Sequence, residues 1–295
     1  MLKKLSRKSK GEIVFEAVVY LILAIIFLIV LLPLLYVLAT SFASAQELAE
    51  NHFLLIPKHP TLEVYRYIFS TGTFARSLLV TVGITFAGTA FNLLMTCLMA
   101  YPLSRRALPG RKVLMTAVTI TLVFSGGTIP MYLVVSSCGL IDSYLSLIIP
   151  GAISSFNLIL VKNFFQEIPE SLIESAQIDG SSEINTLIKI VLPLSKPALA
   201  TFTMFYAVDH WNQFLEPLLY LNDSKKWPIQ ILLRQIVLMS QSGVGDEDAM
   251  PPGFVLPVDS LKMACIVIAT VPIILAYPFM QKYFDKGVMV GSVKG

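Results

Sequence analysis

Long stretches without a charged side chain alternate with short polar segments along this chain. Four of the stretches are uninterrupted, at residues 17–46, 77–104, 113–141 and 143–161. A fifth, at 197–222, contains Asp209 and Glu216, and a sixth covers 263–281. A helix needs roughly 17 to 25 mainly apolar residues to cross a bilayer. The pattern therefore predicts six membrane-spanning helices.

The composition places the chain in the same class. Hydrophobic residues make up 55% of the 295-residue sequence and charged residues only 14%, whereas soluble domains carry about 25% charged residues. A soluble protein with a large core would not need uncharged runs of this length. We therefore interpret the chain as an all-α polytopic membrane protein with six transmembrane helices. Residues 1–16 form a basic N-terminal segment, and residues 17–295 form the membrane domain.

Basic residues indicate which side of the membrane is cytoplasmic, because Lys and Arg in short loops resist transfer across the bilayer. Most of the 22 Lys and Arg residues fall before the first predicted span, between the second and third, between the fourth and fifth, and after the sixth. This predicts that both termini and residues 168–193 are cytoplasmic, and that residues 40–76, 136–142 and 223–259 form outer loops. The net charge of +3 then reflects orientation, and no nucleic-acid partner is expected.

Sequence patterns for catalysis, metal binding and nucleotide binding are missing. His52, His59 and His210 do not have the spacing of metal ligands, and three cysteines predict no disulfide framework. The chain also lacks a Gly-x-x-x-x-Gly-Lys-Ser/Thr loop for ATP phosphates. We therefore expect no enzyme, no metal and no cofactor in this chain.

The predicted cytoplasmic segment 168–193 is charged and prone to form helices. Pro169 suits the first turn of a helix, and Glu170 and Glu174 follow it, where the helix dipole favours negative charge. Gly180 supplies a turn, and Pro193 is expected to end a second helix. A helix-turn-helix on the membrane surface fits docking into a soluble partner better than an ordinary interfacial loop.

The fifth predicted span carries aromatic, acidic and amide side chains at spacings of three and four residues, which places them on one helical face. They are Tyr206, Asp209, Gln213, Glu216 and Tyr220, with His210, Trp211 and Asn212 adjoining them. Ionisable residues within a membrane face a bundle interior or an aqueous cavity, and such a surface suits carbohydrate. Two interpretations stay open: a substrate path, or pairing of the acids with a neighbouring helix.

The third predicted span contains Gly126, Gly127 and Pro130. A break there frees backbone groups inside the membrane, which is tolerated only where other helices or a water-filled cavity satisfy them. It is either a packing kink or a broken helix beside a transport path, and the sequence leaves both open.

One motif resembles a known family. Glu174, Ala176 and Gly180, followed by Ile190 and then Leu192 and Pro193, resemble the EAA loop of permease subunits of binding-protein-dependent ABC importers. Ser175 stands where the family's first Ala stands, and this small residue should pack similarly. The resemblance runs from the first span to the end of the chain. It is closest to the carbohydrate branch, like the smaller permease of the maltose importer, and to its aldouronate and complex-oligosaccharide subgroup.

This resemblance implies a type I ABC importer permease fold, with core spans at 77–285 and a coupling helix within 168–193. The implied residues for ATPase coupling are Glu174, Ser175, Ala176, Asp179, Gly180, Ser181 and Pro193. The implied contacts with the binding protein, matched by position only, are Gly243, Gly245, Asp246, Glu247 and Asp248.

The same resemblance implies the partners. They are a second homologous permease, two ATPase subunits that bind ATP and Mg, an extracellular sugar-binding protein, an oligosaccharide and membrane lipid. The expected location is a bacterial plasma membrane, and the expected mechanism is ATP-driven alternating access.

Two other classes remain as alternatives. A self-contained secondary transporter would often show an internal repeat, and none is evident; residues 168–193 would also be unexplained. A polytopic membrane enzyme would need a nucleophile and a base, and only His210 beside Asp209 offers such a pair in the membrane.

Overall fold

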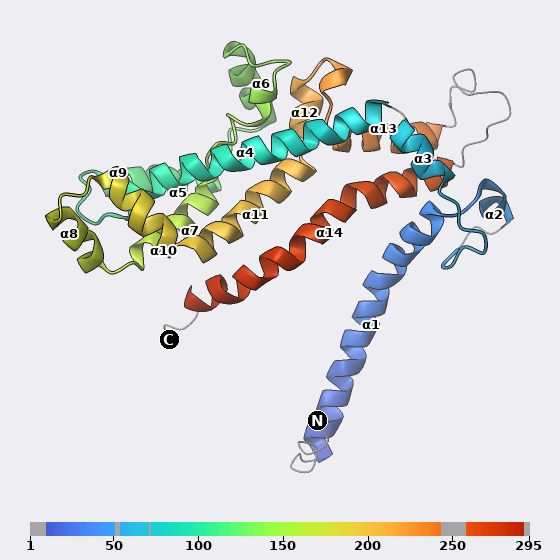
Figure 1. The fold of residues 1–295 in the computed structure, drawn as a ribbon, viewed down its shortest axis with the longest axis horizontal. Coiled ribbons are helices and arrows are strands. Elements are labelled where there is room, and N and C mark those ends of the chain that lie inside the picture. Colours follow the sequence, from blue (N-terminus) through green and yellow to red (C-terminus); the bar gives the residue numbers. More distant parts are fainter. Residues whose placement is uncertain (1–9, 51–53, 71, 243–257, 292–295) are drawn as a thin grey trace. The chain divides into compact units, whose positions relative to one another are not determined.

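The computed structural model describes residues 10–50, 54–70, 72–242 and 258–291, which contain helices, turns and loops and no strand (Figure 1). The residues proposed to contact a binding protein, Gly243, Gly245, Asp246, Glu247 and Asp248, lie outside these ranges. The chain divides into two compact units. Unit 1 comprises Met1–Ser70 and Ile236–Ile268, and unit 2 comprises Thr71–Gln235 and Ala269–Gly295.

Unit 1 contains α1 (Lys10–Ser41), α2 (Ala45–Glu50) and α3 (Glu63–Ser70). Large apolar side chains are exposed along almost the whole of α1, and a helix that is apolar all round is stable only inside a bilayer or another protein. At its end the ring of Phe42 stacks on Tyr65 with a centroid distance of 5.1 Å. The Tyr65 hydroxyl donates to Ser41 Oγ at 2.8 Å.

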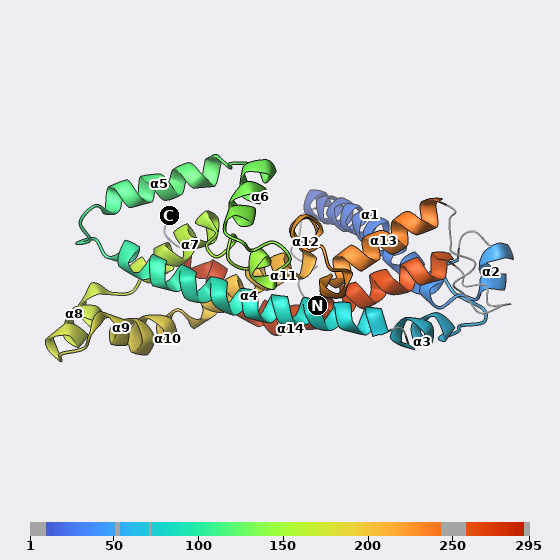
Figure 2. The ribbon, with the colours of Figure 1, turned by 90° about the horizontal axis from the view of Figure 1, so that it is seen from above.

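Unit 2 is built on α4 (Gly72–Ser104), which packs along α7 (Ser155–Gln166) and α11 (Lys196–Asn212) (Figures 1 and 2). Apolar side chains from these helices form its main core, which includes Tyr101, Leu158, Val161, Phe165 and Phe202. The core therefore joins the second, fourth and fifth predicted spans.

The other elements begin and end as follows: α5 (Arg111–Val123), α6 (Thr128–Ser137), η2 (Tyr144–Leu147), α8 (Glu170–Ile178), α9 (Glu183–Thr186), η3 (Leu187–Val191), α10 (Leu192–Leu194), α12 (Leu215–Tyr220), η4 (Ser224–Lys226), α13 (Ile229–Ser242) and α14 (Val258–Gly291). The α13 and α14 helices each contribute residues to both units.

Three helices in the described part of the chain are long and apolar enough to cross a membrane: Gly11–Ser41, Gly72–Ser104 and Asp259–Pro278. Two bent helix pairs raise the number to five if each pair is one span. The α5 and α6 pair is bent by 117° at the predicted break, where Gly127 has a φ of +84°. The second pair is bent by 87° between Leu194 and Lys196.

The fourth predicted span is not one helix. Residues 143–161 instead form η2, a loop and the beginning of α7, which has 12 residues. Pro150 and Gly151 lie in that loop. Proline has no N–H for a helical hydrogen bond and disfavours helical conformation at the residue before it, whereas hydropathy registers neither effect. The prediction of one continuous helix at 143–161 was therefore wrong, and six spans remain a prediction.

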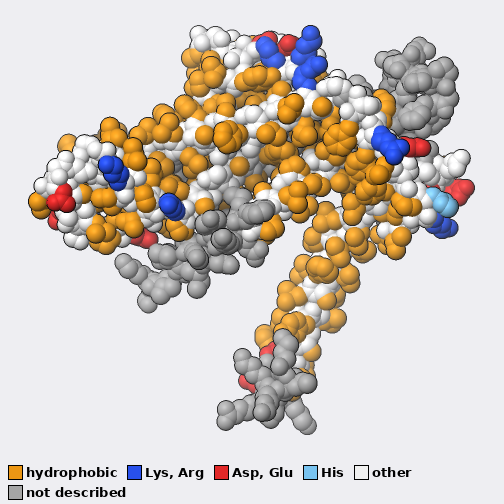
Figure 3. Space-filling model, viewed as in Figure 1, with side chains coloured by type: hydrophobic (Ala, Val, Ile, Leu, Met, Phe, Trp, Pro, Cys, Tyr) orange, Lys and Arg blue, Asp and Glu red, His pale blue; other side chains and the backbone are white. Residues whose placement is uncertain are grey.

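Hydrophobic side chains cover most of the visible surface of unit 2 (Figure 3). The Lys, Arg, Asp and Glu side chains seen in this view on unit 2 gather mainly near the α8–α10 end and near α12. An apolar band flanked by charged ends is what a bilayer requires of a protein surface.

Candidate functional site

The α8 helix ends in a hydrogen-bonded turn centred on Gly180. The Gly180 N–H donates to the Gln177 carbonyl at 3.0 Å, and the Ser181 N–H donates to the Ala176 carbonyl at 2.9 Å. Together they form a Schellman motif, which satisfies carbonyls at the helix end and needs a left-handed residue. Gly180 has a φ of +81°, and a Cβ there would be strained. The turn predicted from Gly180 is confirmed.

The second helix of this segment is anchored by two side chains. Ser182 caps α9 by accepting a hydrogen bond from the Asn185 N–H at 3.3 Å. The Glu183 carboxylate accepts from the Tyr101 hydroxyl at 2.5 Å and from Gln177 Nε2 at 2.7 Å. Because Tyr101 lies on α4 and Gln177 on α8, Glu183 connects the segment to the longest helix of unit 2. Sequence reasoning missed this residue, since its partner on α4 is 82 positions away.

The residues expected to couple to an ATPase differ in exposure. Glu174, Ser175, Asp179, Gly180 and Pro193 are exposed and Ser181 is partly so, whereas Ala176 is buried. Two apolar residues near the turn are strongly exposed, Ile178 at 85% and Ile184 at 67%. The segment thus combines acidic groups with uncovered apolar side chains.

Pro193 does not end the second helix as expected. A π-helical turn, η3, precedes it and α10 includes it, and the bend comes at Ser195. Proline cannot donate a hydrogen bond to the carbonyl four residues earlier, and its ring crowds that carbonyl. The chain absorbs this misfit in the wider turn before Pro193. The α11 helix then begins at Lys196, with Pro197 in its first turn.

The fifth predicted span is also interrupted. The α11 helix ends at Asn212, Gln213 has an extended backbone, and α12 begins at Leu215. Pro217, in the first turn of α12, lacks the N–H that would continue α11. The prediction that Tyr206 through Tyr220 share one face of a single helix was therefore wrong.

Most of the expected path residues nevertheless line one pocket. It has a volume of about 470 Å³. Six of the expected residues contribute: Tyr206, Asp209, His210, Asn212, Gln213 and Glu216. The opposite side is formed by residues that include Leu147, Gly151 and Ser154, together with Asn92 of α4. We call it the polar pocket.

Trp211 and Tyr220 lie elsewhere. Trp211 is buried and its Nε1 donates to the Ala269 carbonyl at 2.9 Å. Tyr220 is buried in a second apolar cluster, where its ring stacks on Tyr132 at a centroid distance of 6.1 Å. Both therefore serve packing within unit 2.

Hydrogen bonds from α4 hold the wall of the polar pocket. The Tyr206 hydroxyl lies 2.7 Å from Thr96 Oγ1, and Asn92 Nδ2 donates to the Gly151 carbonyl at 3.0 Å. Gly88 lets α4 approach His210, because a Cβ at residue 88 would lie 2.4 Å from His210 Nε2. Thr96 and Asn92 of α4 thus fix α11 and the loop before α7, respectively, around one space.

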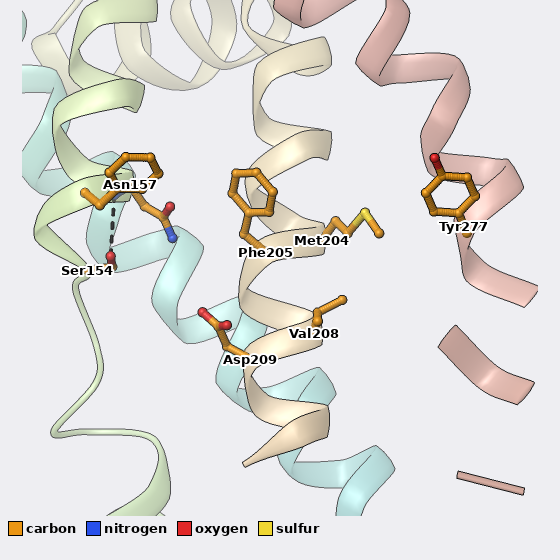
Figure 4. Close-up of a pocket in the computed structure, with 8 residues that line it drawn as sticks. Ser154, Asn157, Met204, Phe205, Val208, Asp209 and Tyr277 are labelled. Atoms are coloured by element: carbon orange, nitrogen blue, oxygen red, sulfur yellow. Dashed lines mark hydrogen bonds between the residues drawn. The ribbon is translucent and has the colours of Figure 1, made fainter. Parts of the chain in front are cut away.

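A larger pocket of about 630 Å³ adjoins the polar pocket and shares Ser154, Val208 and Asp209 with it. Figure 4 shows the Asp209 carboxylate directed from α11 toward the side on which Ser154 lies, while Val208 and Met204 point toward Tyr277 of α14. Asp209 therefore borders both spaces. The described pockets are not lined by Gly126, Gly127 or Pro130, so the α5–α6 break has no assigned role.

A charged cluster joins two loops of unit 2. Asp142 has a left-handed backbone with a φ of 59°, and its Oδ1 accepts from the N–H groups of Asn222 and Asp223, both at 3.1 Å. Lys226 Nζ donates to Asp142 Oδ2 at 2.7 Å. The hydrogen bond from Lys226 and those from the backbone hold the pKa of the Asp142 carboxyl below its ordinary value. The same contact raises the pKa of Lys226.

Known proteins resemble this chain over nearly its whole length. A family profile described as "Binding-protein-dependent transport system inner membrane component" matches residues 1–290. The polygalacturonan/rhamnogalacturonan transport system permease protein YtcP of Bacillus subtilis (strain 168) is 53% identical, over 95% of this chain and 98% of its own. Protein LplC of the same organism is 51% identical over 97% of both chains.

A solved structure agrees with these relatives. One chain from the crystal structure of a bacterial ABC transporter involved in the import of the acidic polysaccharide alginate has a TM-score of 0.88 and 30% identity to this chain. The match covers 94% of this chain and 99% of that one.

Proposed function

The chain belongs to the family of binding-protein-dependent transport system inner membrane components, and from this premise we propose how it imports its cargo. It is the transmembrane permease of an ABC importer for oligosaccharides. Family membership decides between the three classes that the sequence left open, and a transport permease is not a catalytic enzyme.

In this proposal residues 168–193, the coupling segment, dock into one of two ATPase subunits, which bind ATP and Mg. A second homologous permease completes the membrane pore. An extracellular sugar-binding protein delivers the cargo to the outer side, where residues 223–259 lie. Both termini are cytoplasmic in a bacterial plasma membrane. Closure of the ATPases moves the coupling segment and opens the path outward, which is a shift between two conformational states.

The structure of the turn at Gly180 is the observation that best supports the coupling role. It presents exposed Ile178 beside exposed Glu174 and Asp179, and an uncovered apolar side chain with polar neighbours is typical of a protein interface. Glu183 then links the segment to α4, and Asn92 of α4 lines the polar pocket. These contacts connect the exposed residues near Gly180, which would dock into the ATPase, with the polar pocket on the proposed substrate path.

Two substitutions test this coupling. A side chain in place of Gly180 is strained by about 1–2 kcal/mol, so Gly180→Val should distort the turn. Glu174→Lys reverses an exposed charge without touching the core. Both variants should assemble in the membrane yet lose most uptake, measured as sugar transported per ATP hydrolysed in proteoliposomes.

The matched control is Glu63→Lys, a charge reversal on α3, which is predicted to lie on the outer side. It should transport like the wild type. Normal uptake per ATP in both Gly180→Val and Glu174→Lys would refute the coupling role.

A further inference from the structure

Lys162, near the end of α7, is a buried lysine without a counter-charge. The residue is 8% exposed, and its Nζ has no hydrogen bond or ion pair to any residue in the described part of the chain. The charge that acts on it is that of Arg111, which has the same sign. Its Nζ is nevertheless not sealed from solvent. Because a buried charge is costly unless it is paired, Lys162 needs an anion from outside the chain, and an anion can reach it.

Hydrogen bonds at the end of α4 place Arg111 beside Lys162. Gln166 follows Lys162 by one helical turn, so the two lie on the same face of α7. Gln166 Nε2 donates to the Ser104 carbonyl at 3.1 Å, and Arg111 Nε donates to the neighbouring Leu103 carbonyl at 2.8 Å. The end of α4 therefore fixes the Arg111 guanidinium next to the face of α7 that carries Lys162. Its two terminal nitrogens have no partner among the described residues.

The first turn of α5 adds a third positive group. Gly110 precedes this 13-residue helix and gives it no side-chain cap. The first N–H groups of a helix lack partners within it, and the helix dipole puts a partial positive charge there. A helix N-terminus of this kind attracts phosphate. The start of α5, Arg111 and Lys162 together form what we call the phosphate site.

From this geometry we infer that the phosphate site binds the headgroup phosphate of an anionic membrane lipid. A lipid fits better than a free anion, because Val113 and Leu114 in the first turn of α5, and Ile120 further along it, are exposed apolar side chains against which acyl chains can lie. The site also lies on the predicted cytoplasmic side, and basic pockets between membrane helices on that side bind anionic headgroups. This role goes beyond the transport of cargo.

The test adds phosphatidylglycerol to the delipidated complete transporter in a neutral detergent. Native mass spectrometry counts the bound lipid and gives its affinity, and thermal unfolding gives the change in Tm. Phosphatidylcholine with the same acyl chains controls for the tails, and sodium phosphate without lipid probes a free anion. We expect phosphatidylglycerol to raise the Tm more than phosphatidylcholine does, and sodium phosphate to leave it unchanged.

Lys162→Met keeps the long apolar stem and removes the charge. It should weaken the binding of phosphatidylglycerol about fivefold, equivalent to ~1 kcal/mol. Without lipid this variant should be at least as stable as the wild type, because it no longer buries an unpaired charge. A lysine with a merely structural role would give the opposite result, a lower Tm without lipid and an unchanged lipid affinity.

Two further variants complete the comparison. Lys162→Arg keeps the charge and should retain most of the lipid affinity. Lys196→Met is the matched control, because Lys196 is an exposed lysine at the start of α11 on the same predicted side of the membrane. Its affinity for phosphatidylglycerol should equal that of the wild type.

Three results would overturn the inference. They are equal affinities of the wild type and Lys162→Met for phosphatidylglycerol, equal stabilisation by sodium phosphate alone, and equal binding of phosphatidylglycerol and phosphatidylcholine by the assembled wild type. None of these measurements depends on transport, so the proposed function would stand. A transporter that binds phosphatidylglycerol as expected but carries no oligosaccharide would refute the proposed function alone.

Discussion

Single polar residues connect the working parts of unit 2, and Glu183 is the clearest of them. Its carboxylate accepts hydrogen bonds from Tyr101 on α4 and Gln177 on α8, and Tyr101 is only 6% exposed. If residues 168–193 move as proposed, this carboxylate should transmit the movement to α4.

A double-mutant cycle measures this link. Tyr101→Phe removes one hydrogen bond to a charged group and should lower the free energy of unfolding by about 1.5–3 kcal/mol. Glu183→Ala should cost at least as much, because it removes both hydrogen bonds. In the Glu183→Ala background Tyr101→Phe should cost little, since the two residues act as one unit. Chemical unfolding of the purified protein in detergent gives the energies, and uptake per ATP should fall in all three variants.

Tyr20→Phe controls for loss of a hydroxyl, because Tyr20 is exposed on α1 and should show neither effect. Strictly additive energies for the Tyr101 and Glu183 variants would mean that the hydrogen bond carries no coupling.

At the scale of elements, sequence patterns located most helices but not their breaks. Pro169 and Gly180 correctly predicted the turn of the coupling segment, because a helix start and a left-handed turn depend on local conformational preferences. The fourth and fifth spans were misjudged, since an apolar run looks the same whether or not Pro150 or Pro217 interrupts it. Asn92 and Asp142 were missed for a different reason. Their partners, Gly151 and Lys226, are distant in sequence, and only the folded chain brings them together.

Two loops are joined by Asp142, and their connection should depend on pH. The pKa of Asp142 is below its ordinary value of 3.8 in the folded protein, so its stabilising effect is complete above about pH 5 and is lost as the pH falls through the lowered pKa. The pKa of Lys226 is above its ordinary value of 10.5, so its effect is lost only as the pH rises through that raised value. The stabilisation from the contacts of Asp142 with Lys226 and with the amides of Asn222 and Asp223 should therefore be constant between about pH 5 and pH 9.

Hydrogen exchange at the Asn222 and Asp223 amides directly measures how well their hydrogen bonds to Asp142 protect them. After correction for the intrinsic rates, protection should be constant from pH 5 to pH 7 and should fall below pH 4. Asp142→Asn keeps an acceptor and tolerates the left-handed backbone, so it should retain part of the protection and lose the acid-dependent step. An acid-dependent step that persists in Asp142→Asn would show that another group is responsible.

At the scale of the whole molecule, the apolar surface of α1 and the apolar band of unit 2 both require a membrane, and the basic loops predict the orientation of the chain in it. Cysteine accessibility tests the direction without a tag. Cys97 and Cys265 are buried, whereas Cys138 is exposed just after α6, in a loop predicted to face outward. A membrane-impermeant maleimide should therefore label the wild-type protein in intact cells, and Cys138→Ser should abolish the labelling.

Ser181→Cys in that background lies in the coupling segment and should react only in inside-out vesicles. Labelling of Ser181→Cys from outside intact cells would reverse the orientation, and the docking of residues 168–193 with cytoplasmic ATPases would then be impossible.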